Sequence, residues 1–253
     1  MPEPINYDHL ADIYDNFVQV NFDIPFFLNA AKECQGEVLE LMSGTGRVSI
    51  PLAEVGIKLT CVDMSADMLS VLRRKLESRQ LSVEIHQANV CELDLGRQFK
   101  LILLPFNSFA EILSAEDQLK ALKRIFQHLQ PGGIFICTLH NPHIRKKSVD
   151  GQLHLWGNYP LLEKDGTLLF WVTQHFDPGG YIVNGIEFFE EYDASGILLS
   201  KRIVEFSFSL ISKEVFEEMA QSVGFKIKTL YGNYSCEEFS DEKSPYLIWL
   251  LQK

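Results

Sequence analysis

Apolar residues follow two spacings along the first 140 residues. Short apolar runs with strand character alternate with longer segments in which apolar residues recur every three or four positions. The runs predicted as strands are 37–42, 57–63, 83–86, 99–106 and 134–139. The segments predicted as helices are 5–18, 23–34, 48–56, 65–79 and 114–130. This alternation predicts a doubly wound α/β fold with a parallel sheet and right-handed crossovers.

The predicted helix ends rest on specific residues. Asp23, Ser65 and Ser114 stand where a helix N-cap is expected, because their side-chain oxygens can accept a backbone N–H. Residues 131–133, Pro-Gly-Gly, predict a sharp turn before the fifth strand.

The pattern changes between about Leu153 and Ser212, where strands and turns follow one another without a helical segment. Strands are predicted at 168–176, 181–192 and 197–210, and turn sequences at 177–180 and 193–196 separate them as in β-hairpins. A helix from Ser212 to Val223 and strands at 225–231 and 246–252 then close the first sheet. The sequence therefore predicts an antiparallel sheet over 141–212, inserted between an α/β core over 1–140 and its C-terminal part over 213–253.

Composition narrows the class of protein. The chain has 253 residues, 46% hydrophobic and 23% charged, which is typical of a globular protein. Its formal charge of −11 argues against a nucleic-acid partner, which usually requires a broad basic surface. No apolar run approaches the roughly 20 residues of a membrane span, and the acidic N-terminus lacks a signal core, so a cytoplasmic protein with no membrane partner is expected. The five cysteines form no C-x-x-C pair, which predicts buried free thiols and no metal site.

Candidate chemistry lies where the predicted parallel strands end. The first strand carries Glu40 and runs into a loop with Gly44 and Gly46. Glycines at this edge let a ligand approach the backbone. Val48 and Ser49 follow where a dinucleotide motif would place its third glycine, so a pyrophosphate ligand is disfavoured. A carboxylate before the glycines suits a ligand with an ammonium group.

The next strands also end in polar residues. Asp63 ends the second strand, where a carboxylate can accept hydrogen bonds from ribose hydroxyls; an acid that starts the next helix is the alternative. Asn89 follows the third strand and can contact an adenine amino group, or simply form a turn. Residues 105–108, Pro-Phe-Asn-Ser, end the fourth strand, where the reacting group of a substrate would lie.

Together these residues resemble the class I S-adenosylmethionine-dependent methyltransferases. Residues 40–46, Glu-Leu-Met-Ser-Gly-Thr-Gly, match the glycine motif of that family, and Asp63 matches its ribose-binding acid. The pairs Tyr7-Asp8 and Tyr14-Asp15 resemble the N-terminal lid of its small-molecule members, including the sugar and glycine N-methyltransferases. Two departures stand out: Met42 replaces a common glycine, and Asn89 replaces an aspartate. Residues 105–108 lack the Asn/Asp-Pro-Pro-Tyr/Phe motif of enzymes that methylate nucleic-acid bases.

The resemblance implies a Rossmann-like methyltransferase sheet, S-adenosylmethionine as cofactor and methyl transfer to a small-molecule acceptor, with nitrogen, oxygen and carbon all open. The cofactor-binding residues that it implies are Tyr14, Glu40, Met42, Gly44, Gly46, Asp63, Met64, Asn89, Val90, Pro105 and Phe106. Candidate general bases are His140 after the fifth strand and His9 or Tyr14 in the lid. A cofactor-binding protein without catalysis, a protein methyltransferase and a nucleotide-dependent oxidoreductase are the alternatives, the last disfavoured by the missing glycine.

The inserted sheet is rich in aromatic residues that need a covering surface. They are Phe170, Trp171, Phe188, Phe189, Phe206 and Phe208. One face of the sheet must pack on the α/β domain or on a partner. The sheet is therefore expected to shape the acceptor pocket or to form a homodimer contact; a purely structural extension is the third alternative.

Overall fold

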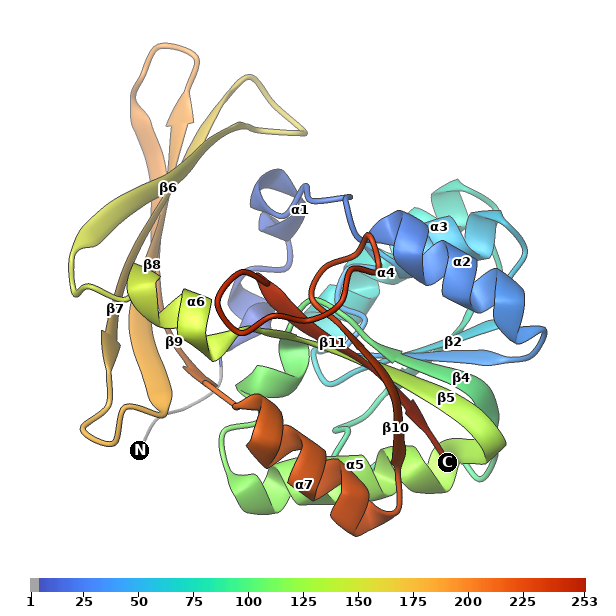
Figure 1. Cartoon of the computed structure of the whole chain (residues 1–253). Coiled ribbons are helices and arrows are strands. Elements are labelled where there is room, and N and C mark those ends of the chain that lie inside the picture. Colours follow the sequence, from blue (N-terminus) through green and yellow to red (C-terminus); the bar gives the residue numbers. More distant parts are fainter. Residues whose placement is uncertain (1–4) are drawn as a thin grey trace.

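The computed structural model describes residues 5–253 and contains two separate sheets (Figure 1). The larger one has seven strands in the order β3-β2-β1-β4-β5-β11-β10. Its strands are β1 Val38–Leu41, β2 Leu59–Asp63, β3 Glu84–Gln87, β4 Phe99–Leu104, β5 Leu129–His140, β10 Lys226–Tyr231 and β11 Tyr246–Gln252. Strands β1 to β5 pair in parallel, and β11 is antiparallel to both of its neighbours. The predicted doubly wound α/β fold is confirmed.

Helices cover both faces of this sheet (Figure 1). One face carries α2 Ile24–Cys34, α3 Ser49–Glu54 and α4 Ala66–Ser78, and the other carries α5 Ala115–His128 and α7 Lys213–Val223. Each face has its own apolar core, the second with large buried side chains such as Phe109, Phe216 and Trp249. The side chains of Ser65, Ser114 and Ser212 each accept a hydrogen bond from the backbone N–H three residues later. All three serine N-caps therefore form.

The smaller sheet has four antiparallel strands in the order β6-β7-β8-β9. They span β6 Leu153–Pro160, β7 Gly166–Phe176, β8 Ile182–Asp193 and β9 Leu198–Ser209. The carboxylates of Asp177 and Asp193 accept backbone N–H groups of the turns that they open, as the hairpin sequences predicted. Strand β6 was not predicted as a separate strand.

We call the face of the smaller sheet that carries Phe170, Phe189 and Val204 its inner face. It packs on Leu10 and Ile13 of the N-terminal segment. At its edge, the Ser209 hydroxyl donates to the carbonyl of Ala110, 2.8 Å away in the turn η2 (Ser108–Glu111) that follows β4. The smaller sheet therefore meets the end of β4, one of the strand ends where candidate chemistry was predicted.

Three local predictions differ from the structure in whole or in part. Residues 5–18 form only the short turn η1 (Tyr7–His9) and the one-turn helix α1 (Tyr14–Phe17), because this segment packs on two different surfaces. Leu10 lies against the smaller sheet, while Ala11 lies against α4.

The other two differences concern helix ends. The Pro-Gly-Gly sequence lies inside β5 as an irregularity in its pairing with β4, so α5 ends at His128 and the strand begins directly after it. Asp23 stands at the N-cap of α2, but its side chain makes no cap hydrogen bond there. Two further helical turns, α6 (Pro142–Arg145) and η3 (Lys146–Ser148), connect the two sheets. Within residues 5–253, no helix combines the length and the apolarity needed to cross a membrane.

Candidate active site at the strand ends

The loop between β1 and α3 surrounds a buried carboxylate. Glu40 is 1% exposed and accepts a hydrogen bond from the Ser49 hydroxyl at 2.6 Å. Burial raises the pKa of Glu40 to about 7. Gly44 and Gly46 have φ angles of +54° and +88°, which side chains rarely adopt. A Cβ on Gly46 would lie 2.3 Å from Leu72 Cδ1, so this glycine also lets the loop pack closely on α4.

Met42 occupies the position where the family commonly has glycine. Its left-handed backbone explains why glycine is common there. Its φ of +54° is left-handed, a conformation that costs an L-residue roughly 1–2 kcal/mol. The side chain is partly buried and packs against the apolar core on the α5 and α7 face. We infer that this packing offsets the backbone strain.

Asp63 joins the glycine loop to the start of α4. Its Oδ2 accepts the N–H of Gly44 at 2.7 Å, and its Oδ1 accepts the N–H of Ser65 at 2.9 Å. Burial raises the pKa of Asp63, although these backbone hydrogen bonds act in the opposite direction. Each carboxylate oxygen keeps a further lone pair for a ligand hydroxyl.

The N-terminal segment docks onto this loop through carboxylates. Asp15 accepts a hydrogen bond from the Thr45 hydroxyl at 2.7 Å and pairs with the Lys75 ammonium at 2.5 Å. Asp8 accepts one from the Ser65 hydroxyl at 2.5 Å. The two Tyr-Asp pairs are thus brought to the glycine loop and α4, as a lid would be.

Arg47 links three of the predicted elements, although the sequence did not single it out. Its guanidinium pairs with both oxygens of Asp23 at 2.5 and 2.7 Å and lies 4.6 Å from the ring centroid of Phe106. Phe106 and Asn107 are consecutive residues with positive φ, 59° and 63°. Arg47 therefore ties the glycine loop to the start of α2 and to the strained turn after β4. An arginine directly after the second glycine was the only available signal.

The residues predicted at the adenine end lie together beyond β2 and β3. Met64 is 61% exposed, Val90 is buried and Asn89 is exposed. The Asn89 side-chain carbonyl accepts the N–H of Cys91 at 2.9 Å, so the turn alternative is realised. The amide NH2 of Asn89 and the apolar Met64 remain available to a flat heterocycle.

His140 ends β5 beside Tyr246, with ring centroids 5.7 Å apart. Burial, together with the charge of Arg145, lowers the pKa of His140 to about 4. The imidazole is therefore neutral near pH 7 and a weak proton acceptor.

Two further acidic residues, Glu111 and Glu187, lie where the two sheets meet, and the sequence did not single them out. Glu111 ends η2 and accepts a hydrogen bond from the Tyr7 hydroxyl at 2.7 Å. Glu187 lies on β8, and the charge of Glu111 acts on it. No periodicity or motif marks either residue; only the meeting of the two sheets brings them together.

Two buried polar atoms of residues 5–253 lack a hydrogen-bond partner: Ser43 Oγ and Asn107 Oδ1. They follow β1 and β4, which are neighbours at the centre of the larger sheet. Buried polar groups normally find partners, so these two point to a bound polar molecule at this edge. The donors and acceptors of an amino acid and a nucleoside fit such an edge.

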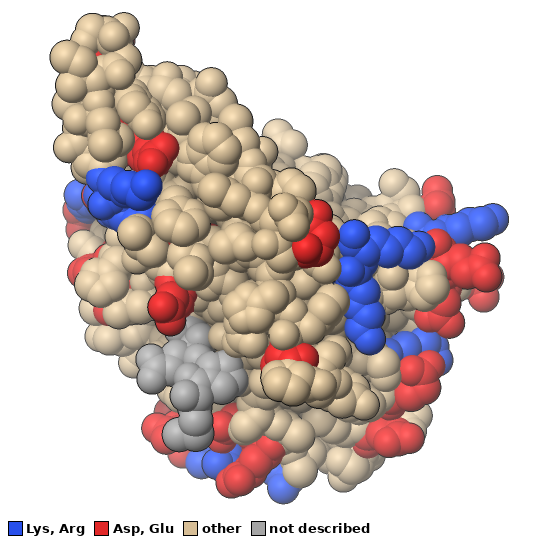
Figure 2. All heavy atoms as spheres, turned by 90° about the vertical axis from the view of Figure 1, so that its left-hand side faces the viewer, with Lys and Arg blue, Asp and Glu red and all other residues tan. Residues whose placement is uncertain are grey.

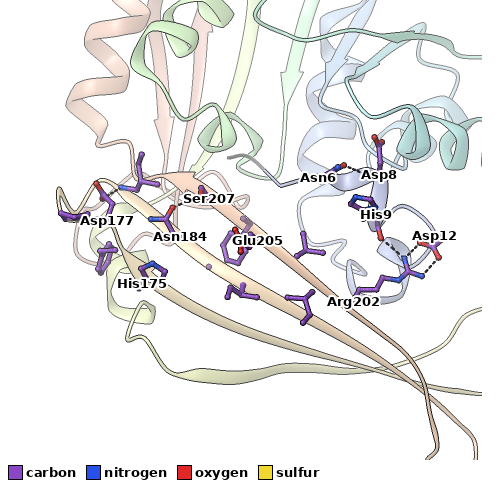
Figure 3. A pocket seen from close by; sticks show the side chains of 18 residues that line it. Asn6, Asp8, His9, Asp12, His175, Asp177, Asn184, Arg202, Glu205 and Ser207 are labelled. Atoms are coloured by element: carbon purple, nitrogen blue, oxygen red, sulfur yellow. Dashed lines mark hydrogen bonds and ion pairs between the residues drawn. The ribbon is translucent and has the colours of Figure 1, made fainter. Parts of the chain in front are cut away.

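A broad concavity of about 1870 Å³ lies elsewhere, between the N-terminal segment and strands β8 and β9 (Figure 3). On one side of it Arg202 pairs with Asp12 at 2.5 and 2.6 Å and donates to the carbonyl of His9 at 2.8 Å. Its lining contains none of the residues predicted to bind the cofactor. His9, one of the candidate bases, faces this concavity.

The outer face of the smaller sheet carries exposed apolar residues, among them Leu155 and Ile203 at 50% and 61% exposure. Seen from this side, the surface is mostly uncharged, with scattered acidic and basic residues (Figure 2). A dimer contact on this face stays a prediction.

Known proteins share both the sequence pattern and the geometry of this edge. Residues 38–133 match the family model described as a methyltransferase domain. A putative methyltransferase of Bacillus subtilis, YqeM, is 28% identical over 140 residues, 53% of this chain and 56% of its own length. The cypemycin N-terminal methyltransferase of a Streptomyces species is 28% identical over 147 residues, 56% of this chain and 59% of its own. The chain thus spans little more than half the length of these curated relatives.

Solved structures share the whole fold. An S-adenosylmethionine-dependent methyltransferase from Clostridium acetobutylicum superposes with a TM-score of 0.82 at 21% identity, covering 97% of this chain and 98% of that one. An amino pentose methyltransferase from Micromonospora echinaspora, with S-adenosylmethionine bound, gives 0.72 at 15% identity over 100% and 99%. These likenesses establish the fold, smaller sheet included. The chain therefore has the fold of an S-adenosylmethionine-dependent methyltransferase, and its residues 38–133 match a methyltransferase domain.

Proposed function

We propose that this protein transfers a methyl group from S-adenosylmethionine to a small-molecule acceptor. The observation that carries the proposal is the docking of the lid on the strand ends. Asp8 and Asp15 bind the very loops that Asp63 holds together, so the predicted cofactor residues share one edge under one cover.

We assign the cofactor contacts by their place at this edge. Asp63 would accept the ribose hydroxyls, and the loop of Gly44 and Gly46 beside Glu40 would face the amino-acid end. Met64, Asn89 and Val90 would flank the adenine. Pro105 and Phe106 would lie near the methyl group, with Tyr14 above them.

The bound cofactor supplies an activated methyl group on a sulfonium. The chain has to hold that group in line with the acceptor and exclude water. The lid aromatics suit this role, since Tyr14 lies 5.9 Å from Tyr7 and 5.3 Å from Phe17 between ring centroids. Phe17 in turn contacts Phe170 and Phe189 of the smaller sheet, at 5.1 and 4.8 Å. A continuous aromatic layer thus runs from the lid to the smaller sheet, which supports an acceptor bound between them.

The relatives support a small-molecule acceptor, but their names do not agree on one methylated atom. They include a demethylmenaquinone methyltransferase, 32% identical over 120 residues, and a Streptomyces venezuelae sugar N,N-dimethyltransferase, 25% identical over 137 residues. The cypemycin enzyme keeps a peptide acceptor as the alternative.

Calorimetric titration with S-adenosylmethionine, S-adenosylhomocysteine and NAD tests the proposal. We expect both sulfur compounds to bind and NAD not to bind. A folded sample that binds neither sulfur compound would overturn the proposal. Binding without uptake of labelled methyl by any acceptor would instead favour a cofactor-binding protein without catalysis.

A further inference from the structure

Glu111 is a desolvated carboxylate with a single partner. It ends η2, directly after the strand β4 that leads to the methyl-transfer edge. The Tyr7 hydroxyl donates to its Oε1, and no hydrogen bond within residues 5–253 reaches Oε2. Burial raises the pKa of Glu111 to about 7. The side chain nevertheless keeps some accessible surface.

Glu187 faces it from the middle of the smaller sheet. Its cross-strand neighbours, Val172 on β7 and Val204 on β9, are 1% and 7% exposed, which places Glu187 on the inner face. No hydrogen bond or ion pair within the described part of the chain reaches its carboxylate. Burial and the charge of Glu111 raise the pKa of Glu187 to about 8. Like Glu111, it keeps some accessible surface.

No basic side chain within residues 5–253 compensates this pair. Three basic side chains around it are matched by acids: Arg47 by Asp23, Lys75 by Asp15, and Arg202 by Asp12 and Glu191. A fourth, Arg145, lies over the ring of Phe208 and donates to Gln174, and it acts on neither Glu111 nor Glu187. Two desolvated carboxylates without a cation are unfavourable, so this pair favours a positively charged ligand.

The occupant must also donate hydrogen bonds. Asn107 opens the turn that ends in Glu111, and its side-chain carbonyl oxygen is buried without a partner. Free oxygens of Glu111, Glu187 and Asn107 are all acceptors. A protonated amine offers charge and several N–H donors at once. A divalent metal is disfavoured, since no group of three or more His, Cys, Asp or Glu side chains that could hold one forms within residues 5–253.

We propose that the methyl acceptor is an amine, which binds as an ammonium ion between Glu187 and Glu111, and that Glu187 takes its proton. This inference rests on the proposed function and specifies the acceptor of the same site. Tyr7 acts as a positioning residue, because its hydroxyl fixes the Glu111 carboxylate.

The chemistry balances without a further reactant. One N–H proton moves from the ammonium to the Glu187 carboxylate, which leaves a neutral amine with a free lone pair. That lone pair forms the new bond to the methyl carbon of the sulfonium donor, and the carbon–sulfur bond breaks with its electron pair on sulfur. The products are a methylated ammonium and a thioether, and Glu187 releases its proton to solvent.

Matched probes test the inference. The protein is saturated with S-adenosylhomocysteine and titrated calorimetrically with benzylamine against benzyl alcohol, and with glucosamine against glucose. We expect at least one amine to bind about tenfold or more tightly than its partner alcohol, because it adds charged hydrogen bonds. Near pH 7 its binding should release protons, seen as a dependence of the heat on the buffer, because the ammonium displaces the proton held by the pair.

Glu187→Gln and Glu111→Gln supply the variants, with Glu205→Gln as matched control. Glu205 is exposed on the outer face of the same sheet. Glu187→Gln should abolish both the preference for the amine and the proton release, while the control keeps both. The titratable groups around the pair are the phenols of Tyr7 and Tyr14, whose pKa values are raised by burial, and the carboxylate of Asp63, whose charge acts on Glu111. The control variant keeps all three groups.

The outcomes separate the two proposals. If S-adenosylhomocysteine fails to bind the folded protein, the proposed function is overturned. If it binds but no amine exceeds its alcohol, or if Glu187→Gln keeps the preference, the proposed function survives and the amine inference is overturned.

Discussion

The two sheets meet, but Asp63 on the larger sheet and Glu187 on the smaller one differ in whether the chain supplies partners for their carboxylates. On the larger sheet, Asp63 is bonded by two backbone N–H groups. The acids of the N-terminal segment that dock there are likewise matched within the chain, Asp15 by Lys75 and Asp23 by Arg47. On the smaller sheet, Glu187 has no partner among the described residues. On our proposals, the cofactor side is therefore held in place largely by the chain itself, whereas the acceptor side takes a ligand that completes its electrostatics.

Breaking the Arg47–Asp23 pair should give the largest effect. Arg47→Leu leaves the Asp23 carboxylate, 1% exposed, without its cation, which should lower the free energy of unfolding by about 3–5 kcal/mol. Chemical denaturation measures this. Lys58→Ala is the control. Lys58 and its partner Glu37 both remain partly exposed, so the free energy of unfolding should fall by less than about 1 kcal/mol. Equal losses in the two variants would contradict a preorganised cofactor side.

Asp63→Ala should come next, through ligand binding. It removes the acceptor that we assign to the ribose and releases the N–H of Gly44, so affinity for S-adenosylhomocysteine should fall by about 2–3 kcal/mol. Calorimetry measures the loss. Glu77→Ala, at an exposed position of α4, should bind like the unmodified protein. Unchanged affinity in Asp63→Ala would remove Asp63 from the site.

The stability that depends on Glu187 should fall as pH rises, whereas a carboxylate paired within the chain would make stability rise with pH. Because the folded-state pKa of Glu187 is raised to about 8, from about 4.5 when unfolded, ionisation disfavours the fold, and the ligand-free protein loses stability as pH rises through this window. Glu187→Gln should therefore be more stable than the unmodified protein at pH 8.5, by about 2 kcal/mol, and equal to it near pH 4.5. Thermal denaturation across this range measures the difference. A variant that is less stable at pH 8.5 would show that the chain already satisfies Glu187.

Met42 offers the finest test of preorganisation. Because φ is +54° there, Met42→Gly should be about 1 kcal/mol more stable than Met42→Ala, the reverse of the usual order. Both lose the packing of the methionine side chain, so their difference isolates the backbone. Denaturant midpoints of the two variants measure it. An alanine variant at least as stable as the glycine variant would show that the turn relaxes.

Local patterns in the chain were enough to predict most of the elements and to place the residues that we propose for the cofactor at one sheet edge. Strand-length apolar runs, serine caps such as Ser65 and hairpin turns such as 177–180 act through contacts a few residues apart, which a linear pattern records. The glycine motif and Asp63 were legible for the same reason, since parallel strands end at one edge and their terminal residues meet there.

The surface opposite that edge could be known only from the folded chain. Arg47 meets Asp23 and Phe106, and Glu187 meets Glu111, across long sequence separations. Residues 5–18 also depend on the folded chain. Their apolar residues are spaced as in one helix but pack on two different surfaces. A desolvated charge is a property of all the atoms packed around it, so Glu187 reads as an ordinary strand residue until the smaller sheet is folded over the larger one.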